Sequence, residues 1–201
     1  PYMYGQFIEH MGRCIHDGIW AEMLQDRKFL LEIGKTWQKT GPESADCEVA
    51  HDTAGAYCGE HCLAIWVRDA AGGDCGICQD GLGLVKGREY VGYAVLRHVA
   101  EPGPVKIRLA WGNDPAAGEE TTISSVAAQY QKVNFRFRAG ENTEQARLSL
   151  TMTQPGYLWV ACLSLMPADA VRGMRADTLE LLKRLNATIY RWPGGNFVSG
   201  Y

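Results

Sequence analysis

Two polar residues near the ends of the chain have types and positions that could hold a small polar ligand. Glu9 directly follows the apolar run Tyr4-Gly-Gln-Phe-Ile8, and Asn196 follows the strand-like run Thr188-Ile-Tyr-Arg-Trp192 and the turn Pro193-Gly-Gly195. Parallel neighbouring strands lie about 4.8 Å apart and bring their carboxyl ends to the same side. If the two runs are such neighbours, the carboxylate and the amide can reach one ligand between them, and the two glycines leave room for it. A solvated loop glutamate and an ordinary turn are the alternative interpretation.

The seven cysteines could bind a metal or serve as small buried hydrophobes. The densest group comprises Cys58, His61 and Cys62, followed by Cys75-Gly-Ile-Cys78. Soft ligands at such short spacings can form a tetrahedral zinc site. However, Cys62 and Cys78 lie in strand-like runs, where cysteine commonly packs as a hydrophobe, and we therefore expect no metal. The odd number of cysteines in a chain of this length favours a reducing, cytoplasmic compartment over a secreted or periplasmic one.

The overall composition limits the classes of partner. The 201 residues are 46% hydrophobic and 21% charged, as in an ordinary globular chain, and the formal net charge is -3. This charge gives no electrostatic reason to bind nucleic acid or an anionic membrane. No apolar run approaches the roughly 18 to 20 residues of a membrane-spanning helix. We therefore expect neither nucleic acid nor a membrane as a partner.

The first region, residues 1–32, predicts a strand followed by a helix. The strand is the run Tyr4–Ile8. After a polar turn, Ile15, Ile19, Met23 and Leu24 recur at helix-like intervals. Glu22 is expected on the solvated face of that helix.

The middle region, residues 33–166, predicts an antiparallel sandwich. Apolar and polar residues alternate in the runs 105–111, 133–137 and 148–152, so each run buries one face and exposes the other. Glycine-rich and proline-rich turns separate some eight or nine candidate strands of this kind. Their number and spacing are typical of a jelly-roll-like β-sandwich.

The third region, residues 167–201, predicts a helix and then a strand. Asp169 is a candidate N-cap, and an apolar stripe runs from Val171 to Leu185. Glu180 and Arg184 form a well-oriented i,i+4 pair, and Asn186 is a plausible helix end. The run Thr188–Trp192 is the expected strand.

A strand and helix at the front and a helix and strand at the back, separated by a β domain, indicate one α/β sheet interrupted by an insertion. A (β/α)8 barrel needs about 250 residues of its own, so at most two of its eight strands can be present. The predicted fold is thus mixed: a partial (β/α)8 TIM barrel, with its first two strands and helices, interrupted by an antiparallel jelly-roll β-sandwich.

Long motifs at both ends and in the middle resemble a known family. The runs Gly5-Gln-Phe-Ile-Glu-His-Met-Gly-Arg-Cys-Ile15, Gly18-Ile-Trp-Ala-Glu22 and Tyr190-Arg-Trp-Pro-Gly-Gly-Asn-Phe-Val-Ser-Gly-Tyr201 are similar to the opening barrel segments of glycoside hydrolase family 51 α-L-arabinofuranosidases. The run Gln79-Asp-Gly-Leu-Gly-Leu-Val-Lys-Gly-Arg-Glu-Tyr-Val-Gly92 resembles the carbohydrate-binding-module-like sandwich inserted in some members.

The resemblance implies an N-terminal part of a retaining glycosidase that releases terminal α-L-arabinofuranosyl groups from arabinose-containing oligo- or polysaccharides. It places both catalytic glutamates beyond Tyr201, so no catalytic residue is assigned here and the fragment is expected to be inactive alone. Glu9 and Asn196 are implied as substrate-binding residues at the sugar subsite. The chemistry requires no metal or organic cofactor. The oligomeric state of the full-length enzyme, including a homo-oligomer, is left open.

Two other functions are left open beside this one. The chain could be a non-catalytic carbohydrate-binding module, or a structural interaction domain. Most aromatic side chains of the middle region fall in alternating strands, where burial explains them, and Trp111 beside a polar loop is the best candidate for stacking on a sugar. We expect the sandwich to act mainly as a scaffold that packs on the barrel.

Overall fold

The computed structural model describes residues 4–10, 12–112, 114 and 116–192, and it divides into two compact units. The larger unit spans residues 24–165, and the smaller combines residues 1–23 with residues 166–201. The chain therefore leaves the smaller unit, builds the larger one and returns. The domain boundaries predicted from the sequence fall after residues 32 and 166.

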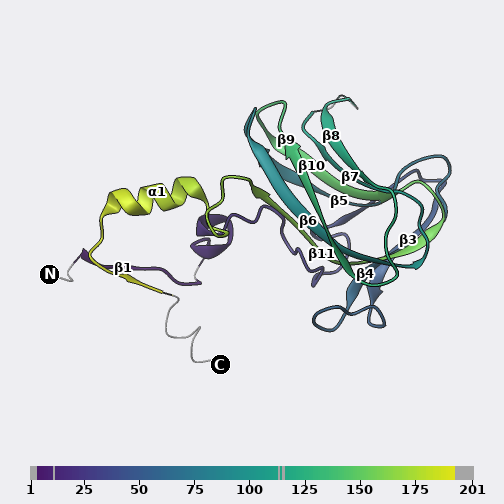
Figure 1. Cartoon of the computed structure of the whole chain (residues 1–201), viewed down its shortest axis with the longest axis horizontal. Coiled ribbons are helices and arrows are strands. Elements are labelled where there is room, and N and C mark those ends of the chain that lie inside the picture. Colours follow the sequence, from purple (N-terminus) through teal and green to yellow (C-terminus); the bar gives the residue numbers. More distant parts are fainter. Residues whose placement is uncertain (1–3, 11, 113, 115, 193–201) are drawn as a thin grey trace. The chain divides into compact units, whose positions relative to one another are not determined.

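The larger unit is a β-sandwich of two five-stranded sheets. One sheet has the order β2-β5-β10-β7-β8 and the other the order β3-β4-β11-β6-β9 (Figure 1). The strands are β2 (Gln38–Thr40), β3 (Asp46–Asp52), β4 (Cys62–Asp69), β5 (Cys75–Leu84), β6 (Glu89–Ala100), β7 (Val105–Ala110), β8 (Gly118–Ile123), β9 (Gln131–Arg138), β10 (Thr143–Met152) and β11 (Gly156–Pro167).

The predicted antiparallel sandwich is confirmed. In the first sheet β10 pairs antiparallel with both β5 and β7, and in the second β4 pairs antiparallel with both β3 and β11. The consecutive strands β3 and β4, and β7 and β8, are antiparallel neighbours, whereas the neighbours β5 and β10 are far apart in sequence and are connected through crossovers.

The alternating runs supply the core of the sandwich. Val105, Ile107 and Leu109 of β7 are fully buried, whereas Lys106 and Arg108 between them are partly exposed. Strand β9 alternates in the same way over the predicted run. In β10 the predicted Leu148, Leu150 and Met152 are buried, but Thr151 between them is buried as well. Burying each such aliphatic side chain contributes about 1.5–3 kcal/mol, so the facing rows hold the two sheets together.

The smaller unit contains a parallel pair of short strands from the two ends of the described chain. Strand β1 (Gln6–Phe7) pairs in parallel with β12 (Tyr190–Arg191) in the register Gln6↔Tyr190 and Phe7↔Arg191. The amide of Gln6 donates to the Ile189 carbonyl at 2.8 Å, and the amide of Ile8 donates to the Arg191 carbonyl at 2.9 Å. The prediction that these two segments run side by side in the same direction is confirmed.

A parallel pair of two-residue strands is not a barrel. The smaller unit also contains the α-helix α1 (Ala176–Leu185), which precedes β12, but the described residues contain no third parallel strand. The (β/α)8 part of the predicted fold is therefore not shown by the structure.

The prediction of a helix after the first strand is wrong. Residues Ile15–Ile19 form only a short π-helical turn, in which His16 is extended and Asp17 has φ +61°. Trp20 then forms an antiparallel bridge with Met174. Ile15 and Ile19 are buried with Ile8, so tertiary packing rather than a helical stripe explains their spacing. Glu22, expected in solvent, is buried.

The second predicted helix exists but starts later. It begins after Arg175, not at Asp169, because Arg172 and Gly173 have positive φ in a turn that pairs Val171 with Met174. Its predicted end is confirmed: Asn186 is left-handed and its amide donates to the Lys183 carbonyl. The Glu180–Arg184 pair is also confirmed, at 3.2 Å between Arg184 Nε and Glu180 Oε1. No helix in the described part of the chain is both long and apolar enough to cross a membrane.

Candidate functional site

The structure places Glu9 near the carboxyl end of β1, as predicted. Its side chain is half-buried, and the residue directly follows Ile8, whose amide donates to the Arg191 carbonyl. Asn196 and the turn before it lie outside the described residues. The parallel strands that would bring the two residues together are present, but the joint site of Glu9 and Asn196 stays a prediction.

An apolar groove of about 230 Å³ lies in the smaller unit beside these strands. Trp192, which directly follows β12, is half exposed at one side of it. The groove is lined by Ile8, Ile19, Met174, Leu179, Leu182, Lys183, Tyr190 and Trp192. Helix α1 has no buried residue, and its Leu181 and Leu185 are exposed. The smaller unit thus presents apolar surface from the helix and from the strand pair.

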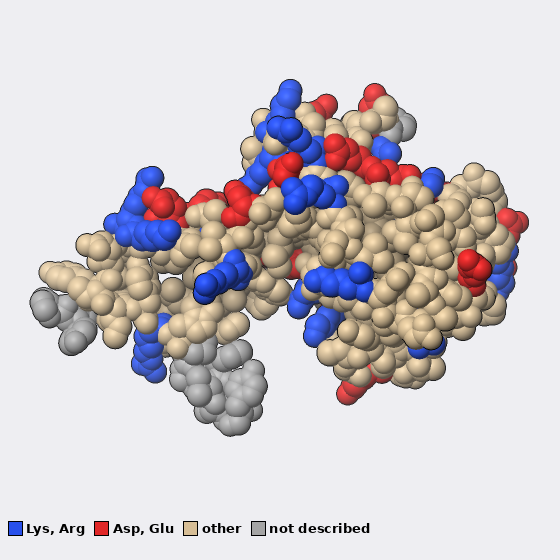
Figure 2. Space-filling view, viewed as in Figure 1, with Lys and Arg blue, Asp and Glu red and all other residues tan. Residues whose placement is uncertain are grey.

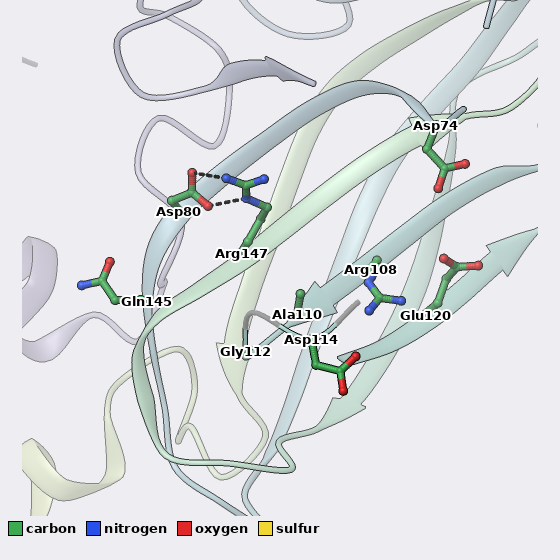
Figure 3. Close-up of a pocket in the computed structure, with 9 residues that line it drawn as sticks. All are labelled: Asp74, Asp80, Arg108, Ala110, Gly112, Asp114, Glu120, Gln145 and Arg147. Atoms are coloured by element: carbon green, nitrogen blue, oxygen red, sulfur yellow. Dashed lines mark hydrogen bonds and ion pairs between the residues drawn. The ribbon is translucent and has the colours of Figure 1, made fainter. Parts of the chain in front are cut away.

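The second candidate site is a polar cleft of about 560 Å³ on the outer face of the β2-β5-β10-β7-β8 sheet. Because side chains alternate along a strand, the residues between the buried rows of β7 and β10 point outward together. The cleft is lined by Asp74, Asp80, Arg108, Ala110, Gly112, Asp114, Glu120, Gln145 and Arg147 (Figure 3). Figure 2 shows acidic and basic side chains interleaved over the part of the sandwich where Figure 1 labels β7 to β10.

Ion pairs fix several of these side chains. Arg147 Nε and Nη2 donate to the two carboxylate oxygens of Asp80 at 2.5 and 3.0 Å, and this carboxylate holds the pKa of the guanidinium above its usual value. Lys106 Nζ lies 3.2 Å from Asp74 Oδ1. Arg108 lies directly opposite Glu120 in the β7–β8 register. The cleft therefore offers both donors and acceptors of hydrogen bonds in fixed positions, a combination suited to hydroxyl groups.

The cleft contains no stacking platform of the predicted kind. Trp111 follows β7 and is half-buried, and its indole packs against Gly140, where an added methyl group would come within 2.8 Å of Nε1. Among the residues that the structure describes, those that line the cleft include neither Trp111 nor another aromatic side chain. Any sugar bound there would be held by polar contacts.

Aromatic residues gather instead on the outer face of the β3-β4-β11-β6-β9 sheet. The rings of Trp66 and Tyr157 lie 5.6 Å apart between centroids, and the Arg68 guanidinium lies 3.7 Å from the centre of the Trp66 ring. The prediction of burial is right for Trp37, Tyr90 and Trp159 but not for Trp66, which is 43% exposed.

A single carboxylate organises this aromatic cluster. Asp52 Oδ2 accepts hydrogen bonds from Tyr157 Oη at 2.7 Å and from Trp159 Nε1 at 2.9 Å. Asp52 Oδ1 accepts from the Ala54 amide at 2.7 Å. The hydrogen bond from Tyr157, with those from Ala54, Trp159 and Gly55, holds the pKa of Asp52 below its ordinary value. Sequence reasoning missed Asp52, because its partners lie more than 100 residues away.

The cysteines and the histidine weighed as possible zinc ligands do not converge on one point. Cys75 and Cys78 lie three residues apart on β5 and so point to opposite faces of that strand, while Cys62 lies on β4 of the other sheet. Among the described residues no group of three or more histidine, cysteine or acidic side chains is arranged to hold a metal ion.

Comparison with known proteins connects the chain with sugar-cleaving enzymes. No protein-family model matches it. Two curated α-L-arabinofuranosidases of Arabidopsis thaliana are each 25% identical to it over 98% of this chain and 32% of the enzyme. An exo-α-(1→6)-L-arabinofuranosidase of Bifidobacterium longum is 66% identical over 29 residues, which are 14% of this chain and 6% of the enzyme. The chain thus spans about a third of the length of the plant relatives it matches.

Comparison of structures concerns the sandwich. The CBM22-1 xylan-binding domain of Xyn10C from Paenibacillus barcinonensis superposes with a TM-score of 0.55 at 15% identity, covering 76% of this chain and 98% of that domain. A CBM4 structure superposes with a TM-score of 0.56 at 13% identity, covering 72% of this chain and 99% of that module. The larger unit therefore has the fold of carbohydrate-binding modules.

Proposed function

We propose that this chain is the N-terminal part of a retaining α-L-arabinofuranosidase. The observation that carries the proposal is the parallel pairing of β1 with β12, which are separated in sequence by a complete sandwich. Similarity to plant arabinofuranosidases along nearly the whole chain supports it. In this proposal the two strands are the first two of a (β/α)8 barrel, and the sandwich is an insertion between them.

Glu9 then acts as a substrate-binding residue and not as a catalytic one. Retaining hydrolysis needs two carboxyl groups about 5–5.5 Å apart, one as the acid and the other as the nucleophile. We assign both to later segments of the longer enzyme. A furanose carries several hydroxyl groups and no charge, so a carboxylate at Glu9 and an amide at Asn196 would orient it by accepting and donating hydrogen bonds.

The apolar surface of the smaller unit supports a longer enzyme. Phe7, Ile189 and Trp192 are each about half exposed, and Leu181 and Leu185 of α1 are exposed as well. Exposed apolar surface and an apolar groove mark a site where other elements pack. We assign that role to the following strand and helix units of the barrel.

The test is an assay of the enzyme encoded by the gene extended past Tyr201. Release of arabinose from an aryl α-L-arabinofuranoside is expected. Glu9→Ala or Asn196→Ala should each lower kcat/KM by about 5- to 150-fold, which corresponds to about 1–3 kcal/mol for a lost hydrogen bond. Glu180→Gln is the matched control, because Glu180 lies on the exposed face of α1 in an ion pair, and should leave kcat/KM unchanged. Unchanged kcat/KM in both site variants would contradict the role of these residues.

A carbohydrate-binding module is the second candidate function, and the polar cleft is the observation that favours it. The cleft volume lies in the range of small-ligand sites, and its side chains are held by ion pairs before any ligand arrives. In this alternative the cleft binds a neutral polysaccharide such as arabinan, arabinoxylan or xylan.

Isothermal titration of the whole 201-residue chain with these polysaccharides tests whether the sandwich binds sugar or acts only as a scaffold. Exposed ion pairs contribute about 0–1 kcal/mol, so Arg147→Ala should leave the fold intact and report on binding alone. Binding by the native chain that is lost in this variant supports the module. Arg68→Ala, which removes an exposed ion pair on the opposite sheet, is the control and should bind normally. Absence of binding in the native chain favours a scaffold.

A further inference from the structure

Two buried cysteines face each other across the interior of the sandwich. Cys47 on β3 pairs with Val67, and both are buried, so Cys47 points inward from one sheet. Cys75 on β5 pairs with buried Met152 and lies two residues before buried Ile77, so Cys75 points inward from the other sheet. Lys39 on β2 lies opposite Ile77 of β5, two residues from Cys75, and its ammonium donates to the Cys47 carbonyl, so one side chain joins the neighbourhoods of the two cysteines.

The two strands that carry these cysteines come close together across the sandwich. Facing sheets usually lie about 10 Å apart, whereas β3 and β5 approach within 8 Å between Cα atoms. Such closeness matters because a disulfide spans only about 4.4–6.8 Å between Cα atoms. The Cys75 sulfur is also held in place: it lies 3.7 Å from the Ala70 carbonyl, and a methyl group on Gly41 would come within 3.1 Å of it.

We propose that Cys47 and Cys75 form a disulfide that joins the two sheets when the protein meets an oxidising disulfide such as oxidised glutathione. The thiolate of one cysteine attacks glutathione disulfide and releases one glutathione thiolate, which leaves a mixed disulfide. The second cysteine then displaces the remaining glutathione. Overall the two cysteine thiols are oxidised to one disulfide, one glutathione disulfide is reduced to two glutathione thiols, and the protons pass to the released thiolates.

The surroundings predict a slow but pH-dependent reaction. Burial raises the pKa of both thiols, and the Lys39 ammonium partly offsets this. The Lys39 ammonium donates to the Cys47 carbonyl and so sits beside the pair. Because the thiolate is the attacking species and is scarce at neutral pH, the rate should rise about tenfold between pH 7 and pH 8.

The link would secure an edge of the sandwich. Strand β3 is an edge strand of its sheet, and β5 is separated from the edge of the other sheet only by the three-residue β2. The disulfide would close the loop of residues 47–75, so it would reduce the conformational freedom of the unfolded chain. For a chain of this size the expected gain is about 5–10 °C in Tm.

The test is oxidation of the full chain in its native state with a glutathione redox buffer. After an acid quench and denaturation, free thiols are blocked with iodoacetamide, the protein is digested with trypsin and a glutamate-specific protease, and the linked and alkylated cysteines are located by tandem mass spectrometry. The expected result is a cross-linked pair of peptides containing Cys47 and Cys75, with the other five cysteines alkylated, and a Tm that rises on oxidation and falls again with dithiothreitol.

Three variants complete the test. Cys47→Ser and Cys75→Ser should each abolish the link and the rise in Tm. Cys78→Ala, on the same strand as Cys75 but on its opposite face, should keep both. Alkylation of Cys47 and Cys75 in the oxidised native protein, mixed disulfides with glutathione only, or links to other cysteines would overturn the proposal. The peptide map of the native sequence decides the matter even if a serine variant fails to fold, and it is independent of any sugar-binding role.

Discussion

At the scale of single residues, Asp52 shows how one carboxylate can order a group of aromatic side chains. It accepts hydrogen bonds from Tyr157, Trp159 and the Ala54 amide. These donors favour the charged form of the carboxyl group, which is why its pKa is lowered. Asp52 therefore stabilises the fold through its ionised state.

Asp52→Asn should destabilise the protein by about 1.5–3 kcal/mol at pH 7, because the amide replaces a charged acceptor with a weaker one and turns a donor toward other donors. The folded pKa lies below the ordinary value of 3.8, so the stabilisation is complete above that pH and is lost as the pH falls through the folded pKa. The gap in unfolding free energy between native and variant chains, measured by urea titration, should thus shrink below about pH 4.

Glu48→Gln is the matched control for Asp52→Asn. It lies on the same strand, but its ion pair with Arg68 is exposed. Its effect should stay within about 0.5 kcal/mol at every pH. A difference between native and Asp52→Asn chains that does not change with pH would contradict the role of the charge.

At the scale of elements, β6 packs so closely against its two neighbours in the sheet, β9 and β11, that position 92 accepts only a glycine. Gly92 on β6 lies opposite Phe135 of β9. A methyl group there would come within 2.3 Å of the Phe135 ring and of the Ser164 carbonyl oxygen. The ring can shift only by displacing its buried neighbours, and the carbonyl belongs to the strand backbone.

Gly92→Ala should therefore cost about 1–3 kcal/mol in unfolding free energy, as expected for overpacking a core. Gly83→Ala on β5 is the control, because a methyl group there meets nothing within 4 Å and Gly83 is exposed. It should be neutral or slightly stabilising, since alanine is less flexible in the unfolded state. Chemical denaturation of the two variants measures the contrast, and equal stability would contradict the packing argument.

At the scale of the whole molecule, the two units have cores of very different size. The buried cluster of the smaller unit consists of Ile8, Ile15 and Ile19, with a few partly buried neighbours. The sandwich buries complete rows of aliphatic side chains from both sheets. Regions with few buried apolar contacts open more readily than the rest of a protein.

Hydrogen exchange of the full chain should separate the two units. Amides in β10 and β11 should exchange at least about 100-fold more slowly than those of β1 and β12, because opening the latter exposes little buried surface. Mass spectrometry of peptides from the two regions after timed exchange provides the measurement. Equal protection of the strand pair and the sandwich core would show that the smaller unit is as stable as the larger one.

Local patterns determined much of the architecture. The alternation of apolar and polar residues in the sequences of β7, β9 and β10 identified the buried and solvent-facing sides of these strands, because successive side chains of a strand point to opposite faces whatever its neighbours are. The end of α1 at Asn186 and its Glu180–Arg184 pair depend on residues within one or two turns. The paired short strands followed from the matching order of elements at the two ends. Where the local pattern misled, the spacing of Ile15 and Ile19 reflected packing around Ile8 and not a helix.

Tertiary structure alone decided which side chains share a site. Arg147 meets Asp80 across 67 residues, Asp52 meets Trp159 across 107, and Cys47 and Cys75 face inward from opposite sheets. These contacts depend on the order of the strands in the sheets. The crossovers that set this order leave no local pattern in the sequence, because the entropy of closing a long loop changes little from one pairing of strands to another. The sequence therefore contains the residues of the cleft, the aromatic cluster and the facing thiols, but it does not show that the members of each group come together in the fold.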